Sequence, residues 1–221
     1  MKLSMKKFGM ITASLAVAGL LMFTLGACAK KSNSQNNSQS NSTSNTKFSA
    51  DNFKQTDKCE ISIKNYGKVI VGLDANAAPI TVENFKKLVN SGFYNGLTFH
   101  RIIDKFMAQG GDPKGDGTGG SEEKIKGEFS ENGVNNTLAH TRGAISMARS
   151  NDKDSASSQF FIVHQTSSNN SQSLDGKYCC FGYVQEGMEV IDKLIADAKP
   201  TDSNGTIAKD KQPIIESIKM L

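Results

Sequence analysis

Hydrophobic and polar residues alternate along two short stretches, residues 59–65 (CEISIKN) and residues 68–73 (KVIVGL). A period of two is typical of a strand that buries one face, because successive side chains point to opposite sides of the sheet. Tyr66 and Gly67 separate the two stretches, and glycine is common in tight turns. We therefore predict a β-hairpin at the start of the globular part of the chain.

Two other stretches follow a helical period. In residues 78–92 and 186–199 the apolar positions recur every three or four residues, which predicts two amphipathic helices. Their apolar stripes are Val82, Phe85, Leu88 and Val89 in the first helix and Met188, Ile191, Leu194 and Ile195 in the second. Thr81 is a suitable N-cap for the first helix, and Gly92 is a suitable end.

Six further short stretches have the length and composition of strands, and turn-forming residues separate them. They are residues 97–103, 106–110, 144–148, 159–164, 179–184 and 213–220. Many short strands with only two helices indicate a closed β-barrel or a sandwich capped by helices. A parallel sheet would need more crossover helices. The composition shows no linker-like break after residue 58, so we expect one domain over residues 58–221.

An uncharged and largely apolar run, residues 8–25, precedes the globular part and follows a basic start. A basic start, an apolar core and small residues before a break are typical of a secretory signal. Leu25-Gly26-Ala27-Cys28 resembles the lipobox of bacterial lipoproteins, in which the signal is cleaved before a cysteine that carries a diacylglycerol. We therefore expect a signal peptide over residues 1–27 and lipid attachment at Cys28. The alternative is a transmembrane helix, for which about 18 residues is a short length.

The stretch that follows is rich in serine, asparagine and glutamine. It has too little apolar surface to fold, so residues 28–57 are predicted to be a lipid-anchored cysteine and a flexible tether. The formal charge of the chain is +4, and removal of a signal with three lysines and no acid lowers it to +1. No basic stripe remains that would indicate nucleic-acid binding. We expect a monomeric extracytoplasmic protein, held by its lipid on the outer face of the cell membrane.

The other three cysteines are Cys59, Cys179 and Cys180. Cys179 and Cys180 are adjacent, so on a strand they point to opposite faces and a bond between them is not expected. In an oxidising compartment Cys59 could pair with one of them. Buried free thiols are the favoured interpretation, because cysteine is among the most buried residue types. No C-x-x-C spacing indicates a zinc site or a redox motif.

Conventional catalytic motifs do not occur in the sequence. His100, His140 and His164 are not part of an H-E-x-x-H motif, and there is no G-x-S-x-G motif. Residues 111–121 (GDPKGDGTGGS) are rich in glycine but lack the phosphate-binding signature, which favours a surface loop. Nucleophilic and hydrolytic chemistry therefore has little support, and we predict no cofactor and no metal.

An arginine and a histidine lie within the otherwise apolar start of FHRIIDKFMAQGGD, residues 99–112, where an unused charge is costly. This stretch resembles the signature region of the cyclophilins, which are peptidyl-prolyl cis–trans isomerases. GTGG (117–120), GAISMAR (143–149), SQFFIV (158–163) and LDGKYCCFG (174–182) follow in the order and approximate spacing of that family, and both predicted helices match. The resemblance covers residues 58–221. It implies a mainly β fold, an eight-stranded antiparallel closed β-barrel capped by two α-helices.

The resemblance also implies a catalytic residue and a binding site. Arg101 takes the position of the family's catalytic arginine, and a permanently charged, rigid fork of donors suits the stabilisation of a twisted prolyl amide. The implied substrate-binding residues are His100, Phe106, Met107, Gln109, Ala148, Arg149, Gln159, Phe161, Leu174 and Tyr178. The apolar members would hold the proline ring, and the two glutamines would bind substrate carbonyls and position the arginine. The backbone at residues 148–149 would bind the residue before proline.

Three positions within this resemblance need separate comment. Ser173 stands where many eukaryotic cyclophilins have a tryptophan that helps bind cyclosporin, which argues against strong inhibition by that drug. Arg149 replaces an asparagine, and its extra charge would favour acidic flanking residues. His100 should point away from Arg101 by strand alternation, whereas the resemblance places it at the rim. A β-bulge would reconcile the two; a histidine satisfied within its strand is the alternative.

The predicted function is peptidyl-prolyl cis–trans isomerisation that assists the folding of exported proteins, with proline-containing unfolded or exported polypeptides as partners. The alternative is a proline-peptide binding module or holdase chaperone with incidental isomerase activity, because one cavity would serve both uses. A metal-dependent hydrolase is disfavoured by the missing ligand spacing.

Overall fold

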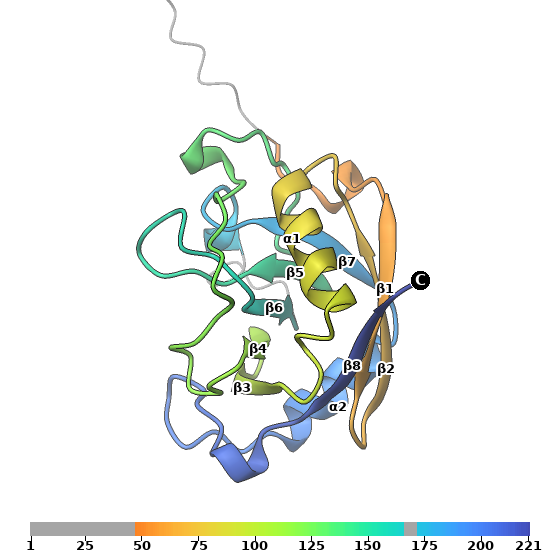
Figure 1. The fold of residues 1–221 in the computed structure, drawn as a ribbon, viewed down its shortest axis with the longest axis vertical. Helices are drawn as coiled ribbons and strands as arrows, with labels where there is room; N and C mark the ends of the chain where they lie inside the picture. The colour runs from red at the N-terminus through yellow and green to blue at the C-terminus, as the bar shows by residue number, and fades with distance from the viewer. Residues whose placement is uncertain (1–46, 166–171) are drawn as a thin grey trace, which may run out of the picture. The chain divides into compact units, whose positions relative to one another are not determined.

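The computed structural model of the protein describes residues 47–165 and 172–221. In this part of the chain strands predominate (Figure 1). The strands are β1 (Asp57–Ile63), β2 (Gly67–Leu73), β3 (Thr98–Ile103), β4 (Met107–Asp112), β5 (Ala144–Met147), β6 (Phe160–Val163), β7 (Cys180–Glu186) and β8 (Ile215–Met220). The helices are α1 (Pro79–Asn90) and α2 (Met188–Asp197), with short 3-10 turns η1 (Ala50–Asn52), η2 (Ser130–Asn132), η3 (Gln172–Leu174) and η4 (Lys209–Lys211). The predicted hairpin, both helices and the six further strands are confirmed.

All of these strands belong to one antiparallel sheet with the order β3-β4-β6-β5-β7-β2-β1-β8. The two edge strands, β3 and β8, meet because the sheet curls. Thr98 and Ile214 form one isolated antiparallel bridge at this seam, and the Phe99 N–H donates to the Pro213 carbonyl at 2.9 Å. The predicted mainly β fold with eight antiparallel strands and two helices is confirmed. The prediction of a closed barrel is overstated, because the seam has a bridge and a few hydrogen bonds instead of a continuous ladder.

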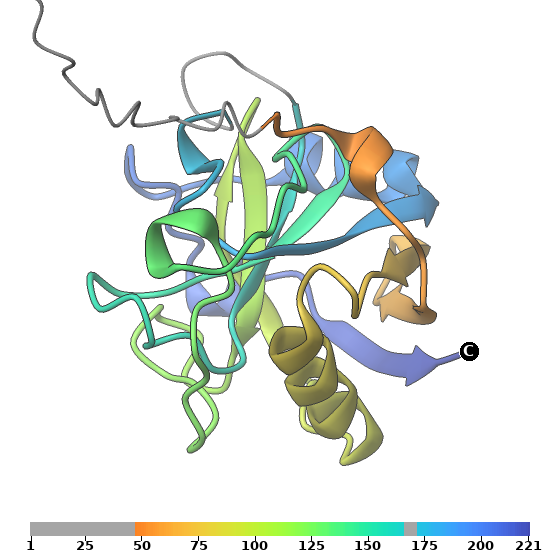
Figure 2. The same ribbon diagram turned by 90° about the horizontal axis from the view of Figure 1, so that it is seen from above.

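The helices cover the sheet from two directions. α1 packs near β8 and α2 packs near β2, and the two helices lie well apart in both views (Figures 1 and 2). Phe85, in the predicted apolar stripe of α1, has its ring 5.3, 5.9 and 5.4 Å from the rings of Tyr94, Phe160 and Phe181. All four side chains are fully buried. These rings form the centre of the main core, and the cavity described below lies on the other side of the sheet.

The start of α1 differs from the sequence prediction. The N-cap position is Ala78, which makes no side-chain hydrogen bond, so the assignment of Thr81 as N-cap is wrong. The Glu128 carboxylate accepts instead from the backbone N–H groups of Ile80 and Thr81 and from the Thr81 hydroxyl, at 3.1, 2.7 and 2.7 Å. A distant side chain therefore caps the helix, which no local pattern could indicate. The predicted end is confirmed, because Gly92 follows the helix with φ of +73°.

The folded part begins before the residue that the sequence suggested. The sequence predicts that residues 47–57 belong to the tether, yet Phe53 packs on the sheet, with its ring 5.2 Å from that of Tyr183 in an edge-to-face arrangement. Phe48 also lies against the folded part. The pattern of residues did not indicate this, because Phe48 and Phe53 are isolated apolar residues in a polar stretch.

The predicted signal peptide, Cys28 and the first part of the tether lie outside the described residues. Across residues 47–165 and 172–221, no helix has the length and apolar character needed to cross a membrane.

The three cysteines of the described chain are buried free thiols, as the sequence favoured. Cys59 forms no disulfide with Cys179 or Cys180, so that alternative is wrong. Burial raises the pKa of the Cys59 and Cys180 thiols to about 12 and also raises that of Cys179. These thiols are therefore protonated and unreactive at neutral pH.

Candidate active site

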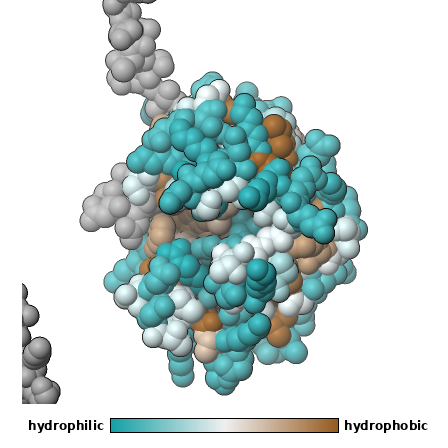
Figure 3. All heavy atoms as spheres, turned by 60° about the vertical axis from the view of Figure 1, so that its left-hand side comes forward, coloured by the Kyte–Doolittle hydropathy of each residue, from teal (hydrophilic) through white to brown (hydrophobic). Residues whose placement is uncertain are grey.

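A cavity of about 480 Å³ opens on the side of β3, β4 and β6 that faces away from the main core. One face of the molecule is hollowed, with brown and tan atoms inside a mostly teal rim (Figure 3). The lining residues are His100, Arg101, Phe106, Met107, Gln109, Asp116, Gly117, Thr118, Ala148, Arg149, Phe161, Leu174, Tyr178, Asn204 and Thr206. Every site residue predicted from the sequence except Gln159 is among them.

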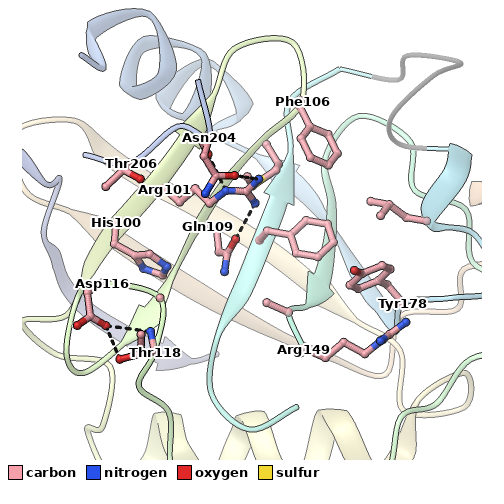
Figure 4. A pocket seen from close by; sticks show the side chains of 15 residues that line it. His100, Arg101, Phe106, Gln109, Asp116, Thr118, Arg149, Tyr178, Asn204 and Thr206 are labelled. Atoms are coloured by element: carbon pink, nitrogen blue, oxygen red, sulfur yellow. Dashed lines mark hydrogen bonds between the residues drawn. The ribbon is translucent and has the colours of Figure 1, made fainter. Parts of the chain in front are cut away.

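The Arg101 guanidinium is fixed in the polar half of the cavity. Its Nε donates to the Asn204 carbonyl at 2.8 Å, Nη2 donates to Asn204 Oδ1 at 3.3 Å, and Nη1 donates to Gln109 Oε1 at 3.1 Å (Figure 4). A guanidinium has five N–H donors, so two remain for a ligand. Burial lowers the pKa of Arg101, while Tyr178 and Asp202 oppose this shift. The group stays charged at neutral pH because an arginine pKa is so high.

A chain of amide side chains holds Gln109 in one orientation. Arginine can only donate, so the Gln109 oxygen faces Arg101 and its Nε2 donates to Gln159 Oε1 at 2.9 Å. Gln159 Nε2 in turn donates to the carbonyls of Gly117 and Gly119, at 3.1 and 2.7 Å. Gln109 therefore holds the arginine, and Gln159 holds Gln109. The second N–H of Gln109 Nε2 is available to a ligand.

A β-bulge brings His100 to the same side as Arg101. The β3–β4 register pairs Phe99 with Gly110 and Arg101 with Gln109, so His100 is an extra residue on β3. The bulge that would reconcile strand alternation with the family resemblance is present, and the alternative of a hydrogen-bonded strand histidine is wrong. His100 is buried, and neither ring nitrogen has a hydrogen-bond partner in the described residues. Burial lowers the pKa of His100, helped by the Arg101 charge and opposed by nearby carboxylates.

Aromatic and aliphatic side chains form the other half of the cavity. In the close view Phe106 and Tyr178 lie across from Arg101 and Gln109 (Figure 4). Phe161 is buried in the floor, with its ring 6.2 Å from that of Tyr178 and stacked at 6.0 Å on the His140 imidazole. Its neighbour Phe160 belongs to the main core, as expected because successive residues of a strand point to opposite faces. An apolar floor beside a fixed cation can hold a ring and polarise an amide at its edge.

The glycine-rich loop contributes more than the sequence suggested. Asp112 is buried and accepts backbone N–H groups of residues 114, 116 and 117 at 2.8, 3.2 and 2.6 Å. These bonds lower the pKa of Asp112 although its burial opposes the shift. The loop so fixed brings Gly117 and Thr118 to the cavity. An aspartate before glycines is a turn signal, and it could have indicated an ordered loop, although not its place at the site.

A second hollow of about 400 Å³ adjoins the cavity. Residues common to both linings are Gln109, Gly117, Thr118, Ala148 and Arg149. Two glycines, four serines, Lys124 and Gln159 complete the second lining. Gln159 thus lies beside the cavity, in the second hollow, and contacts the cavity residue Gln109. Two joined hollows have room for residues on either side of a bound proline.

Arg149 stands between the two hollows and is held by the protein itself. Its Nε and Nη2 donate to the Lys177 carbonyl at 3.0 and 2.9 Å, and its guanidinium lies 4.6 Å from the centre of the Tyr178 ring. The Ala148 N–H donates to the Gln159 carbonyl at 2.9 Å. The Ala148 N–H is therefore already bonded, and a peptide backbone would contact the other backbone groups of residues 148–149.

Sequence reasoning missed Asp116, Asn204 and Thr206. Asn204 is 103 positions from Arg101, and it lies in a turn between α2 and β8 that has no feature to distinguish it from other polar turns. Within the described ranges, no group of three or more histidine, cysteine or acidic side chains could hold a metal ion.

The site contains a fixed cation, an apolar floor and aligned amide donors on an antiparallel barrel-like sheet. A site of this kind suits a ligand that has an apolar ring beside an amide group. A family model described as "Cyclophilin type peptidyl-prolyl cis-trans isomerase/CLD" matches residues 58–220. The chain belongs to this family, and its activity is that of a peptidyl-prolyl cis–trans isomerase.

Two bacterial isomerases and one solved structure are similar to this chain. The chain is 42% identical over 148 residues to peptidyl-prolyl cis-trans isomerase B of Bacillus subtilis (strain 168), covering 67% of this chain and 92% of that protein. It is 38% identical over 160 residues to peptidyl-prolyl cis-trans isomerase B of Escherichia coli (strain K12), covering 70% and 94%. A crystal structure of a cyclophilin-type isomerase from Cryptosporidium parvum, solved in the presence of the dipeptide Ala-Pro, matches with a TM-score of 0.63 and 29% identity. That match covers 74% of this chain and 98% of the solved one.

Proposed function

We propose that Arg101 catalyses the isomerisation by donating a hydrogen bond to the prolyl nitrogen as the amide twists. Rotation about an amide bond faces a barrier of about 18–20 kcal/mol, because the nitrogen lone pair is delocalised into the carbonyl. Twisting localises that lone pair on nitrogen, where a cationic donor can meet it. The interaction exists only in the twisted state, so it lowers the barrier without tightening ground-state binding.

The observation that carries this proposal is the fixed guanidinium with two unused donors at the edge of an apolar floor. Asn204 and Gln109 hold Arg101 on one side, and Phe106 and Tyr178 lie opposite (Figure 4). Phe161 also lines the cavity. Because the donors are oriented before the substrate binds, little reorganisation is needed in the transition state. The solved relative with Ala-Pro present supports a proline peptide as the ligand class.

The test is the isomerisation of a proline tetrapeptide by wild type and by Arg101→Ala. Loss of one preorganised donor should lower kcat by about 10²–10³, with an unchanged circular dichroism spectrum. Arg142→Ala is the matched control, because Arg142 is an exposed arginine that bonds Asp192 away from the cavity lining. Undiminished turnover by Arg101→Ala would refute the mechanism.

We further propose that the enzyme acts on exported proteins while anchored by lipid at Cys28. The support is the order of a basic start, an apolar run, the LGAC sequence and a polar stretch ahead of the isomerase domain. Mass spectrometry of the protein purified from membranes should find a chain that begins at a lipid-modified Cys28. An unprocessed Met1 or an unmodified Cys28 thiol would exclude the anchor without affecting the catalytic proposal.

A further inference from the structure

A short segment ahead of the family match lies behind one wall of the cavity. The match begins at residue 58, whereas residues 47–57 are already part of the folded unit. Phe48 is half-buried against Gly176, so that a Cβ added there would lie 3.3 Å from Phe48 Cζ. Gly176 is in the turn that brings Leu174 and Tyr178 to the cavity.

The segment is fixed independently of this turn, to the loop at Thr137 and to strand β7 at Tyr183. The Ser49 N–H donates to the Thr137 carbonyl at 3.0 Å, and Asn52 Nδ2 donates to the Thr137 hydroxyl at 3.0 Å. Phe53 packs edge to face on Tyr183. A segment held at several points is rigid enough to support the turn, which a loose tether is not.

The turn itself is held mainly from the side of residues 129–149. Arg149 donates to the Lys177 carbonyl, and the Glu131 N–H donates to the Gly176 carbonyl at 2.9 Å. Within the turn, the N–H groups of Lys177 and Tyr178 donate to the Leu174 carbonyl at 2.9 and 3.0 Å. Hydrogen bonds therefore hold most of this turn. Phe48, which lies outside the family match, adds an apolar contact to it.

We propose that Phe48 is a positioning residue for proline binding. Its ring holds the turn at Gly176 in place, so that Leu174 and Tyr178 keep the spacing that a proline ring requires. Without the ring the turn can shift away from Phe161 and widen the cavity. The effect falls on substrate binding, because Arg101 and its partners Asn204 and Gln109 lie on the opposite side (Figure 4). This inference rests on the proposed use of the cavity for proline.

The experiment compares kcat and KM for a proline tetrapeptide, in the detergent-solubilised full chain, among wild type, Phe48→Ala, Phe48→Tyr and Phe53→Ala. Phe53→Ala is the matched control, since it removes the same ring from the same segment at a point that contacts Tyr183 instead of the turn. We expect Phe48→Ala to raise KM about fivefold, which corresponds to about 1 kcal/mol, with little change in kcat. Phe48→Tyr should restore KM, and Phe53→Ala should lower Tm while KM stays at the wild-type value.

Two results would overturn the inference. One is an unchanged KM in Phe48→Ala; the other is a KM that rises equally in Phe48→Ala and Phe53→Ala in step with their loss of Tm, which would show a merely structural role. Failure of the proposed function would look different. In that case the wild-type chain itself would not turn over the peptide, or Arg101→Ala would turn it over undiminished.

Discussion

Replacement of Gln109 by glutamate tests whether the charge of Arg101, and not only its shape, drives catalysis. In Gln109→Glu a carboxylate oxygen would stand where Oε1 now accepts from Arg101 Nη1 at 3.1 Å. The arginine would remain in place, since a carboxylate is a stronger acceptor than an amide. The positive field at the prolyl nitrogen would nevertheless be partly cancelled, because a negative charge would lie just behind the guanidinium.

The geometry gives the size of the effect. The prolyl nitrogen lies one further hydrogen bond beyond the guanidinium, so it would be about 6 Å from the new carboxylate. With an effective dielectric constant of about 20, two full charges at that distance repel by about 3 kcal/mol. Half a charge on the twisted nitrogen gives about 1.4 kcal/mol, so Gln109→Glu should lower kcat/KM about tenfold through charge alone.

The assay is the isomerisation of a proline tetrapeptide at pH 7, with Gln109→Met as the neutral control. Both variants lose the hydrogen bond from Gln109 Nε2 to Gln159, and Gln109→Met also loses the acceptor for Arg101 Nη1. A larger loss of activity in Gln109→Glu, which keeps that acceptor, therefore reports the charge. We expect Gln109→Met to lose activity and Gln109→Glu to lose about ten times more, without a lower Tm. Equal activities, or a glutamate variant as active as wild type, would show that the Arg101 charge does not act on the prolyl nitrogen.

Two other predictions concern charge at the rim and in the bulge. Lys124 and Arg149 line the second hollow, and none of the ion pairs in the described residues includes either. Peptides with glutamate two residues before proline should therefore be turned over about fivefold faster than peptides with lysine there. This ratio of rates should be smaller in high salt and in Lys124→Gln. Equal rates for the two peptides at low salt would contradict the prediction. Because burial lowers the pKa of His100, the unfolded chain binds a proton that the folded chain does not. The stability due to this residue is complete above its ordinary pKa of about 6.5 and is lost as pH falls through the lower folded value. Thermal melts between pH 7 and 5 should therefore show a smaller drop in Tm for His100→Gln than for wild type. Equal drops in the Tm of the two proteins would contradict this assignment to His100.

The parts of the fold that the sequence predicted are those with a local signal. The hairpin of β1 and β2 and the apolar stripes of α1 and α2 depend on side-chain periods within a few residues. The features that the sequence missed depend on distant contacts. Glu128 caps α1 from 47 positions away from Thr81, and Asn204 holds Arg101 from 103 positions away. Both partners are ordinary polar loop residues, so only the folded chain shows what they bind.

The bulge in β3 explains why strand alternation and the family resemblance predict different positions for His100. Alternation predicts that it points away from Arg101, whereas the resemblance places it at the rim of the site. A regular strand has a side-chain period of two and cannot present Arg101 and its neighbour to one cavity. One extra residue on β3 removes this limit, and the partner strand has to accommodate it. Gly110 does so, because a Cβ there would stand 2.8 Å from the Thr98 carbonyl oxygen. A glycine on β4 thus permits the close approach that puts a cation and an imidazole side by side, at the cost of a buried imidazole without a partner. We propose that a substrate contacts this imidazole, because a buried polar group without a partner is costly unless a ligand satisfies it.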